Sequence, residues 1–341
     1  MNPPIPTALP QLTPTTARGG ALRVLEQSVE GLLPLPGLTA EQYARGHALF
    51  EARSDQRGLM TAWLCALLAA RPEGPTRVLS IGCGDGSVDV EVARTLAWTG
   101  QPVDYAGIEP NAAVADRCLT RLSAVAGVRA VVDQRALADS PLVEGRYDVV
   151  LAVHSLYYVP DLADALRTAR RALAPGGVLV VLHAPRQQLN QLVDVLAPDQ
   201  HQPFSAAVAR ALSDAGDPVL RLRLEATLDL TPSDEHLDTA VLDFAVQVRL
   251  PVFLRGLVLN VLAEAALPSP GLRVPHPVDA FVVSGPVADS ETRKLVQRVQ
   301  RGAPSSARRG DHDMAIDTEQ RPPCRCRQRP SPWLPLHRTA G

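Results

Sequence analysis

The sequence predicts an α/β fold with a seven-stranded, mostly parallel sheet and helices on both faces. From residue 77 to residue 184, short apolar runs alternate with segments of helical periodicity, which is typical of parallel strands joined by crossover helices. The first run, Val78 to Ile81, breaks into closely spaced glycines before the helical pattern resumes. A strand, a glycine loop and a helix N-terminus together form a cradle for a nucleotide-like ligand.

Composition and charge narrow the class of protein. Of the 341 residues, 46% are hydrophobic and 21% are charged, which is ordinary for a globular chain with a substantial core. The net charge of −2 favours neither nucleic acid nor an anionic membrane as a partner, and no apolar run has the length of a membrane span. The N-terminus lacks the pattern of a signal peptide. We therefore predict a cytoplasmic protein without nucleic-acid or membrane partners, and we leave its oligomeric state open.

The cysteines predict no disulfide framework and no metal site. The chain has five cysteines, and Cys324-Arg325-Cys326 is the pair with the closest spacing. No second pair of cysteines or histidines lies near it at the spacing of a zinc site. We interpret it as two thiols in a disordered tail.

The chain divides into an arm, a main domain and a tail. Residues 1–38 are a Pro-rich N-terminal arm with one helix, over 21–33. The main domain covers 39–285 and begins with a helical cap over 39–70. Residues 286–341 are rich in Arg and Pro and are predicted to be a disordered tail.

Within the main domain, the elements follow from periodicity and breakers. Helices in the cap are expected over 39–50 and 55–70. Strands are expected over 78–81, 103–108, 128–132, 147–153 and 178–182, with helices over 87–94, 111–124 and 161–174 between them. Beyond residue 184 we expect helices over 205–215, 237–248 and 252–266, a long strand over 219–230 and a last strand over 278–283. The two late strands are expected to be antiparallel to each other and to complete the sheet.

The glycine loop has the form G-x-G-x-G, with Gly82, Gly84 and Gly86. Glycine allows a sharp turn and a close approach of the backbone to a ligand. A dinucleotide fingerprint requires its third glycine at Ser87, one residue later. This spacing weakens the alternative of a nucleotide-binding oxidoreductase, which stays open.

Other ligand-binding candidates follow the carboxyl ends of the later strands, where open α/β sheets bind their ligands. Glu109 ends the second strand, and a carboxylate there holds the two hydroxyls of a ribose. Ala136 and Leu137 are expected beside an adenine ring. His154 follows the fourth strand and either accepts a proton from a nucleophile or hydrogen-bonds the substrate.

Four segments together resemble class I S-adenosylmethionine-dependent methyltransferases: VLSIGCGDG, GIEPN, YDVVLAVHSLYYV and LAPGGVLVVL. The resemblance implies a Rossmann-like fold, the class I methyltransferase fold, with S-adenosylmethionine as cofactor and a cofactor half over 77–184. The expected cofactor-binding residues are Gly82, Gly84, Asp85, Gly86, Glu109, Ala136, Leu137 and Val153. Most such enzymes have an acidic residue where this chain has Ser80. Either the affinity for the cofactor is therefore lower, or Asp85 takes over that role.

Within this class, the chain resembles the histamine N-methyltransferase-like family. Similar segments are Leu79–Gly82, Glu109-Pro110 and Leu156–Val159. The resemblance implies an enzyme that methylates a small-molecule substrate, with an amine nitrogen as the favoured acceptor. It also implies that Asp55 supplies a carboxylate to the substrate amine and that His154 replaces a glutamine that touches the substrate.

The catalytic candidates are His154 and Tyr157, and the substrate-binding candidates are Asp55 and His154. A methyltransferase-fold partner subunit without catalytic activity is a second alternative. Methylation of nucleic acid or protein is disfavoured by the near-neutral charge and by the lack of an Asn-Pro-Pro-Tyr type motif for a flipped base.

Overall fold

The computed structural model describes residues 19–284, apart from 32–33, 73, 199–201 and 217–218. Residues 1–18 of the predicted N-terminal arm and the predicted tail over 286–341, with the Cys324–Cys326 pair, therefore lie outside the described residues. Within the described part, no helix is both long enough and apolar enough to cross a membrane.

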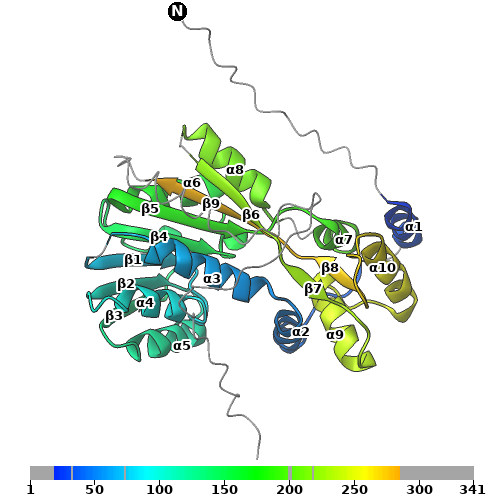
Figure 1. Cartoon of the computed structure of the whole chain (residues 1–341). Coiled ribbons are helices and arrows are strands. Elements are labelled where there is room, and N and C mark those ends of the chain that lie inside the picture. Colours follow the sequence, from blue (N-terminus) through cyan, green and yellow to red (C-terminus); the bar gives the residue numbers. More distant parts are fainter. Residues whose placement is uncertain (1–18, 32–33, 73, 199–201, 217–218, 285–341) are drawn as a thin grey trace, which may run out of the picture. The chain divides into compact units, whose positions relative to one another are not determined.

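A seven-stranded sheet forms the centre of the structure, in the order β3-β2-β1-β4-β5-β9-β6 (Figure 1). Its strands are β1 (Thr76–Ile81), β2 (Val103–Ile108), β3 (Val128–Asp133), β4 (Tyr147–Val153), β5 (Leu173–His183), β6 (Val219–Leu224) and β9 (Val278–Ser284). The first five are parallel to one another, whereas β9 is antiparallel to both β5 and β6. The predicted fold class and the antiparallel pair of late strands are confirmed.

Helices cover both faces of this sheet, because alternate strand residues point to opposite sides. Val78 belongs to the apolar cluster under α3 (Gln56–Ala69), α4 (Asp89–Ala97) and α5 (Ala112–Ser123). The next residue, Leu79, belongs to the cluster under α6 (Leu162–Arg171) and α8 (Ser205–Asp214). Two of these helices begin at a side-chain cap, since Asn111 accepts from Val114 N and Asp161 from Asp164 N.

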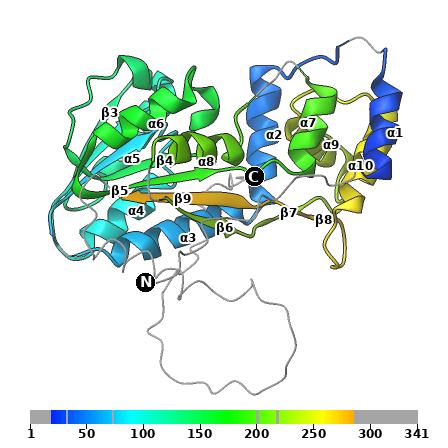
Figure 2. The same ribbon diagram turned by 90° about the horizontal axis from the view of Figure 1, so that it is seen from above.

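A third apolar cluster lies outside the main sheet and joins mainly helices (Figure 2). Its elements are α1 (Gly20–Val29), α7 (Gln188–Leu196), α9 (Glu235–Val246), α10 (Val252–Glu264), β7 (Thr227–Asp229) and β8 (Arg273–Pro275). The helix α2 (Ala40–Ala52) packs along α9. Neither α7 nor β8 was predicted. The buried residues Leu189, Leu192 and Leu196 give α7 a helical spacing that was available in the sequence, whereas β8 has only three residues.

Two predicted boundaries were wrong for packing reasons. The expected strand over 219–230 is two strands, β6 and β7, because Glu225 and Ala226 leave the main sheet and β7 pairs with β8 in a separate two-stranded sheet. The expected helix break at Pro175-Gly176-Gly177 lies inside β5, which begins at Leu173. A Cβ at Gly177 would lie 2.9 Å from the carbonyl oxygens of Ala174 and Tyr147, so the strand passes there only as glycine.

A buried carboxylate connects the late strands. Asp279 on β9 is 1% exposed and accepts hydrogen bonds from Ser205 Oγ at 2.6 Å, Arg221 Nη2 at 2.5 Å and Arg223 Nε at 2.8 Å. Burial opposes ionisation, but the hydrogen bonds from Arg223, Ser205 and Arg221 outweigh it and lower the pKa of Asp279.

We expect Asp279→Asn to lower the free energy of unfolding by about 2–3 kcal/mol at pH 7, because it weakens charge-assisted hydrogen bonds in the sheet. A lowered folded-state pKa gives stability above the unfolded-state pKa that is lost as pH falls through the folded-state pKa. The difference between variant and wild type should therefore shrink in acid, as measured by urea unfolding at pH 7 and pH 3. Asp104→Asn, which removes an exposed pair with Arg129, is the control and should change stability by less than about 1 kcal/mol. An equal loss in both variants would contradict the prediction.

Candidate active site

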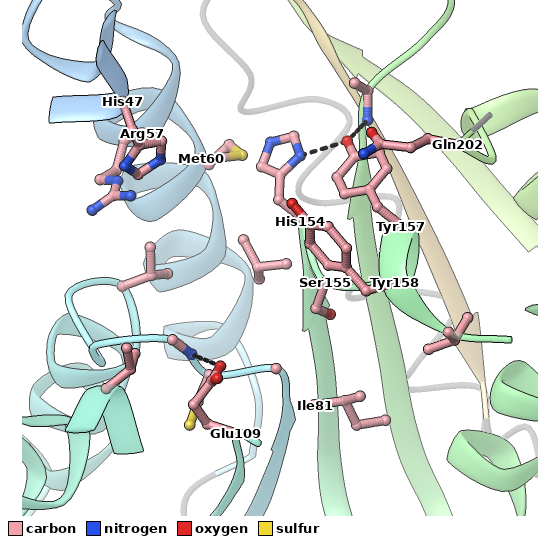
Figure 3. Close-up of a pocket in the computed structure, with 18 of the residues that line it drawn as sticks. His47, Arg57, Met60, Ile81, Glu109, His154, Ser155, Tyr157, Tyr158 and Gln202 are labelled. Carbon is pink, nitrogen blue, oxygen red and sulfur yellow. Dashed lines mark hydrogen bonds between the residues drawn. The ribbon is translucent and has the colours of Figure 1, made fainter. Parts of the chain in front are cut away.

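A cavity of about 1180 Å³ lies at the carboxyl ends of β1, β2 and β4. Ligand pockets commonly hold about 300–1,000 Å³, so this volume has room for more than one small ligand. Two groups of residues form its wall. One follows the strands of the main sheet, and the other comes from α2, α3, α7, α9 and the residues around His276. Figure 3 shows part of this wall, with Glu109 on one side and His154 and Tyr157 on the other.

The glycine loop reaches the cavity through Gly82 and Gly84, which both have left-handed backbone, with φ of 66° and 57°. A Cβ on Gly82 would lie 2.3 Å from Ser155 Cβ, whereas a Cβ on Gly84 would meet nothing within 4 Å. The backbone N–H groups of Gly82 and Cys83 donate to the Ile108 carbonyl, which ties the loop to β2. Gly84 is therefore the glycine whose open side faces the cavity.

Gly86 does not line the cavity. Its φ is 76°, and a Cβ there would lie 2.8 Å from Cys118 Sγ on α5. This glycine lets the loop pack closely on the neighbouring helix. The expected direct contact between Gly86 and the cofactor is therefore not supported by the cavity, although the residue still shapes the loop.

Glu109 lies at the end of β2 and is half-buried in the cavity wall. Gly84 N donates to its Oε2 at 3.2 Å and Asn111 N donates to its Oε1 at 2.9 Å. Each carboxylate oxygen has a further lone pair, so the carboxylate is held in place and still able to accept from two hydroxyls. Ala136, Leu137 and Val153, which are also expected to bind the cofactor, line the same cavity.

Asp85, which was expected to take over the role of the acidic residue missing at Ser80, is already paired within the protein. Asp85 lines the cavity, but it accepts from Arg121 Nη1 at 2.6 Å and from Ser87 N at 3.1 Å. Burial raises the pKa of Asp85, but these hydrogen bonds and the charge of Arg121 outweigh burial and lower it. Asp85 is therefore an ionised carboxylate that is already paired within the protein.

Asp89 is the cavity carboxylate that sequence reasoning missed. It is 5% exposed and accepts from Tyr105 Oη at 2.8 Å, and Ser80 is hydrogen-bonded to it. Burial raises its pKa, against the effect of the hydrogen bonds from Ser80 and Tyr105. The available signal was its position in the first turn of the helix that follows the glycine loop.

His154 and Tyr157, the two catalytic candidates, come together at the end of β4. His154 has a φ of 49°, which is rare for a residue other than glycine, and its ring stacks on Tyr157 at a centroid distance of 5.9 Å. Tyr157 Oη lies 2.9 Å from His154 Nδ1 and accepts from Ala184 N at 2.9 Å (Figure 3). The pKa of His154 is lowered to about 3. Burial of the ring is the largest cause, and the charges of His183, His276 and Arg57 add to it.

Asp55 lies outside the cavity wall, although its neighbours Ser54, Gln56 and Arg57 belong to it. Its carboxylate is exposed and accepts from Thr227 N at 2.6 Å and from Thr227 Oγ1 at 3.1 Å. These bonds join the start of α3 to β7. The geometry therefore gives no support to the expected contact between Asp55 and a substrate amine.

Comparison with known proteins decides the family of this part of the chain. Residues 52–216 match a family model described as a methyltransferase domain. This segment contains the glycine loop, Glu109 and the His154–Tyr157 pair, within a sheet of the strand order given above. Residues 52–216 are thus similar to methyltransferase domains, and their sheet belongs to the class I methyltransferase fold. The cofactor of this domain is S-adenosylmethionine.

Two curated relatives are similar to this methyltransferase domain. The ubiquinone biosynthesis O-methyltransferase of Caulobacter sp. (strain K31) is 34% identical over 105 residues, which is 31% of this chain and 39% of that protein. The norajmaline N-methyltransferase of Rauvolfia serpentina is 27% identical over 128 residues, or 37% of this chain and 42% of that protein. The chain thus spans about two fifths of the length of these relatives.

Among solved structures, the YcgJ protein of Bacillus subtilis has a TM-score of 0.46 and 14% identity, and the match covers 67% of this chain and 97% of that one. The methyltransferase assignment rests on the family match. That match leaves the oxidoreductase alternative without support, and the histamine N-methyltransferase-like resemblance is not confirmed at the level of a subfamily.

Proposed function

We propose that the protein transfers the methyl group of S-adenosylmethionine to a small-molecule nucleophile, with an amine nitrogen as the first candidate acceptor. The observation that supports this best is that one cavity joins the glycine loop and Glu109 to the His154–Tyr157 pair. Its volume suits the cofactor together with a small second ligand.

The residues near the glycine loop fit this cofactor. The left-handed turn at Gly84 allows close backbone approach, the Glu109 carboxylate is oriented for ribose hydroxyls, and Leu137 offers an apolar contact for adenine. Asp89 is proposed to face the ammonium group of the cofactor, because it is a buried carboxylate at the same end of the cavity. The bound sulfonium supplies a methyl group that is already activated. The protein then has to align the nucleophile with it and exclude water.

The second part of the cavity is lined by aromatic side chains that suit a planar substrate. Phe244 of α9 lies 5.2 Å from the Tyr43 ring and 5.1 Å from the Phe50 ring, measured between ring centroids, and all three line the cavity. Among the residues that α2 contributes to the cavity wall, Glu51 is the carboxylate. It is already paired with Arg57 and, at 3.3 Å, with His47. We therefore propose that an amine substrate binds in its neutral form, which is also the nucleophilic one.

An oxygen acceptor is the second candidate, because the relative with 34% identity is named an O-methyltransferase. A panel of aromatic amines and the phenols of the same skeletons separates the two. Each compound is incubated with the full-length protein and S-adenosylmethionine, and S-adenosylhomocysteine is measured by mass spectrometry. Turnover of amines supports the first candidate, and turnover of phenols alone supports the second. A protein that binds S-adenosylhomocysteine and produces none of it with any compound would contradict the proposed function and favour a partner subunit without activity.

A further inference from the structure

The hydrogen bonds of Tyr157 define the proton position on His154. The Tyr157 hydroxyl has one proton and can accept two hydrogen bonds. The Ala184 backbone N–H is a donor, so Tyr157 Oη accepts from it at 2.9 Å. Among the described residues, the remaining hydrogen-bond partner of Tyr157 is His154 Nδ1, also at 2.9 Å.

Two arrangements satisfy this second distance, and they differ in what they leave unpaired. If His154 Nδ1 carries the proton, Tyr157 Oη accepts twice, so both the Tyr157 hydroxyl proton and the Nε2 lone pair are left unpaired. If Nδ1 is unprotonated, Tyr157 donates to it, and Nε2–H is the single group left unpaired. Each buried unpaired group costs about 1–3 kcal/mol, which favours the second arrangement. In a neutral imidazole, the proton then lies on Nε2.

His154 Nε2 is buried and has no hydrogen-bond partner within the described residues. The ring belongs to the cavity wall and lies beside Met60, as Figure 3 shows. Its backbone stays in the left-handed region, which costs of order 1–3 kcal/mol for a residue other than glycine, so the surrounding structure holds the ring in this position. A buried N–H without a partner requires an acceptor. Since the His154 ring belongs to the cavity wall, a ligand in the cavity is the available source of one.

We propose that His154 is a hydrogen-bond donor, through Nε2–H, to an oxygen atom of the substrate, and that it is not the general base. The inference rests on the proposed function and adds a substrate class: small molecules with a carbonyl, ether, phenol or carboxylate oxygen next to the nucleophile. The donor does not bond the nucleophile itself, because that would occupy the lone pair that attacks the methyl group. The ring is neutral near pH 7, since burial and the nearby groups His183, His276 and Arg57 lower its pKa.

The proton position can be measured without any substrate. The full-length protein is labelled with ¹⁵N-histidine, and two-bond ¹H–¹⁵N correlation spectra show which ring nitrogen is protonated. His154→Gln identifies the signal by its disappearance. We expect the Nε2–H form in the wild type and a mixture of both forms in Tyr157→Phe, which removes the donor to Nδ1. An Nδ1–H form in the wild type would overturn the proposal. This measurement does not depend on cofactor binding. A wrong assignment of the proton on His154 can therefore be distinguished from a failure of the proposed function.

The substrate oxygen is tested by preference between paired amines. Aniline and 2-methoxyaniline, with matched ring analogues, differ by one oxygen next to the nitrogen. We expect kcat/KM to favour the oxygen-bearing member by about tenfold, as one hydrogen bond of about 1.4 kcal/mol implies. His154→Leu should abolish this preference and His154→Gln, which keeps an N–H donor and has no base, should retain part of it. A preference that is unchanged in His154→Leu, or absent in the wild type, would overturn the assignment of the substrate oxygen.

Discussion

Replacing Glu109 by alanine is expected to weaken the binding of S-adenosylhomocysteine by about 100-fold. The carboxylate is held by the N–H groups of Gly84 and Asn111, so it reaches two ribose hydroxyls without reorganisation. Two hydrogen bonds to a charged group contribute about 1.5–3 kcal/mol each before the cost of desolvation, which leaves about 2.7 kcal/mol for the pair. Calorimetric titration of wild type and variant measures the difference.

The control for this experiment is Glu144→Ala, an exposed carboxylate outside the cavity wall that is paired with Arg171. Its affinity for S-adenosylhomocysteine should be that of the wild type. Glu109→Gln should give an intermediate affinity, since it keeps one acceptor oxygen and loses the charge. An unchanged affinity in Glu109→Ala would show that the ribose binds elsewhere, and a failure of the wild type to bind would contradict the cofactor assignment.

Replacing Gly82 by alanine is expected to lower the free energy of unfolding by about 3–4 kcal/mol. Gly82 and Gly84 have almost the same left-handed φ, so alanine adds a similar backbone strain of about 1–2 kcal/mol at each position. At Gly82 the new Cβ would also lie 2.3 Å from Ser155 Cβ. The displacement of neighbouring atoms that relieves this overlap costs about 2 kcal/mol. Gly84→Ala has no such overlap, and its cost should stay near 1–2 kcal/mol.

Gly82→Ala and Gly84→Ala should also differ in their affinity for S-adenosylhomocysteine. Gly84→Ala places a methyl group in the cavity and should reduce the affinity for S-adenosylhomocysteine more than its small effect on stability implies. A double variant, Gly82→Ala with Ser155→Gly, removes the atom that overlaps and should recover about half of the lost stability. Chemical denaturation of the wild type, Gly82→Ala, Ser155→Gly and the double variant completes the cycle. Equal destabilisation by Gly82→Ala and Gly84→Ala would contradict the role given to Ser155.

The parallel sheet was predictable because its signals are local in the chain. The runs at 103–108 and 147–153 are apolar because both faces of a central strand are covered, and these two strands have the predicted boundaries. Asn111 and Asp161 mark helix starts through bonds to backbone three residues ahead. The break of 219–230 into two strands was not predictable, since it depends on which distant strand each half pairs with.

The sequence by itself determined the fold class, the glycine loop and the position of Glu109, because a strand, its turn and the next helix are neighbours in the chain. Only the tertiary structure decided which charged groups remain available to a ligand. Asp85 and Asp55 are paired with Arg121 and Thr227, whereas Asp89 lies buried in the cavity wall. It also brought His154 next to Tyr157, whose hydroxyl accepts from the Ala184 backbone just after β5. A side chain's pKa and its free hydrogen-bonding atoms depend on neighbours that folding brings from distant parts of the chain, and no local pattern records them.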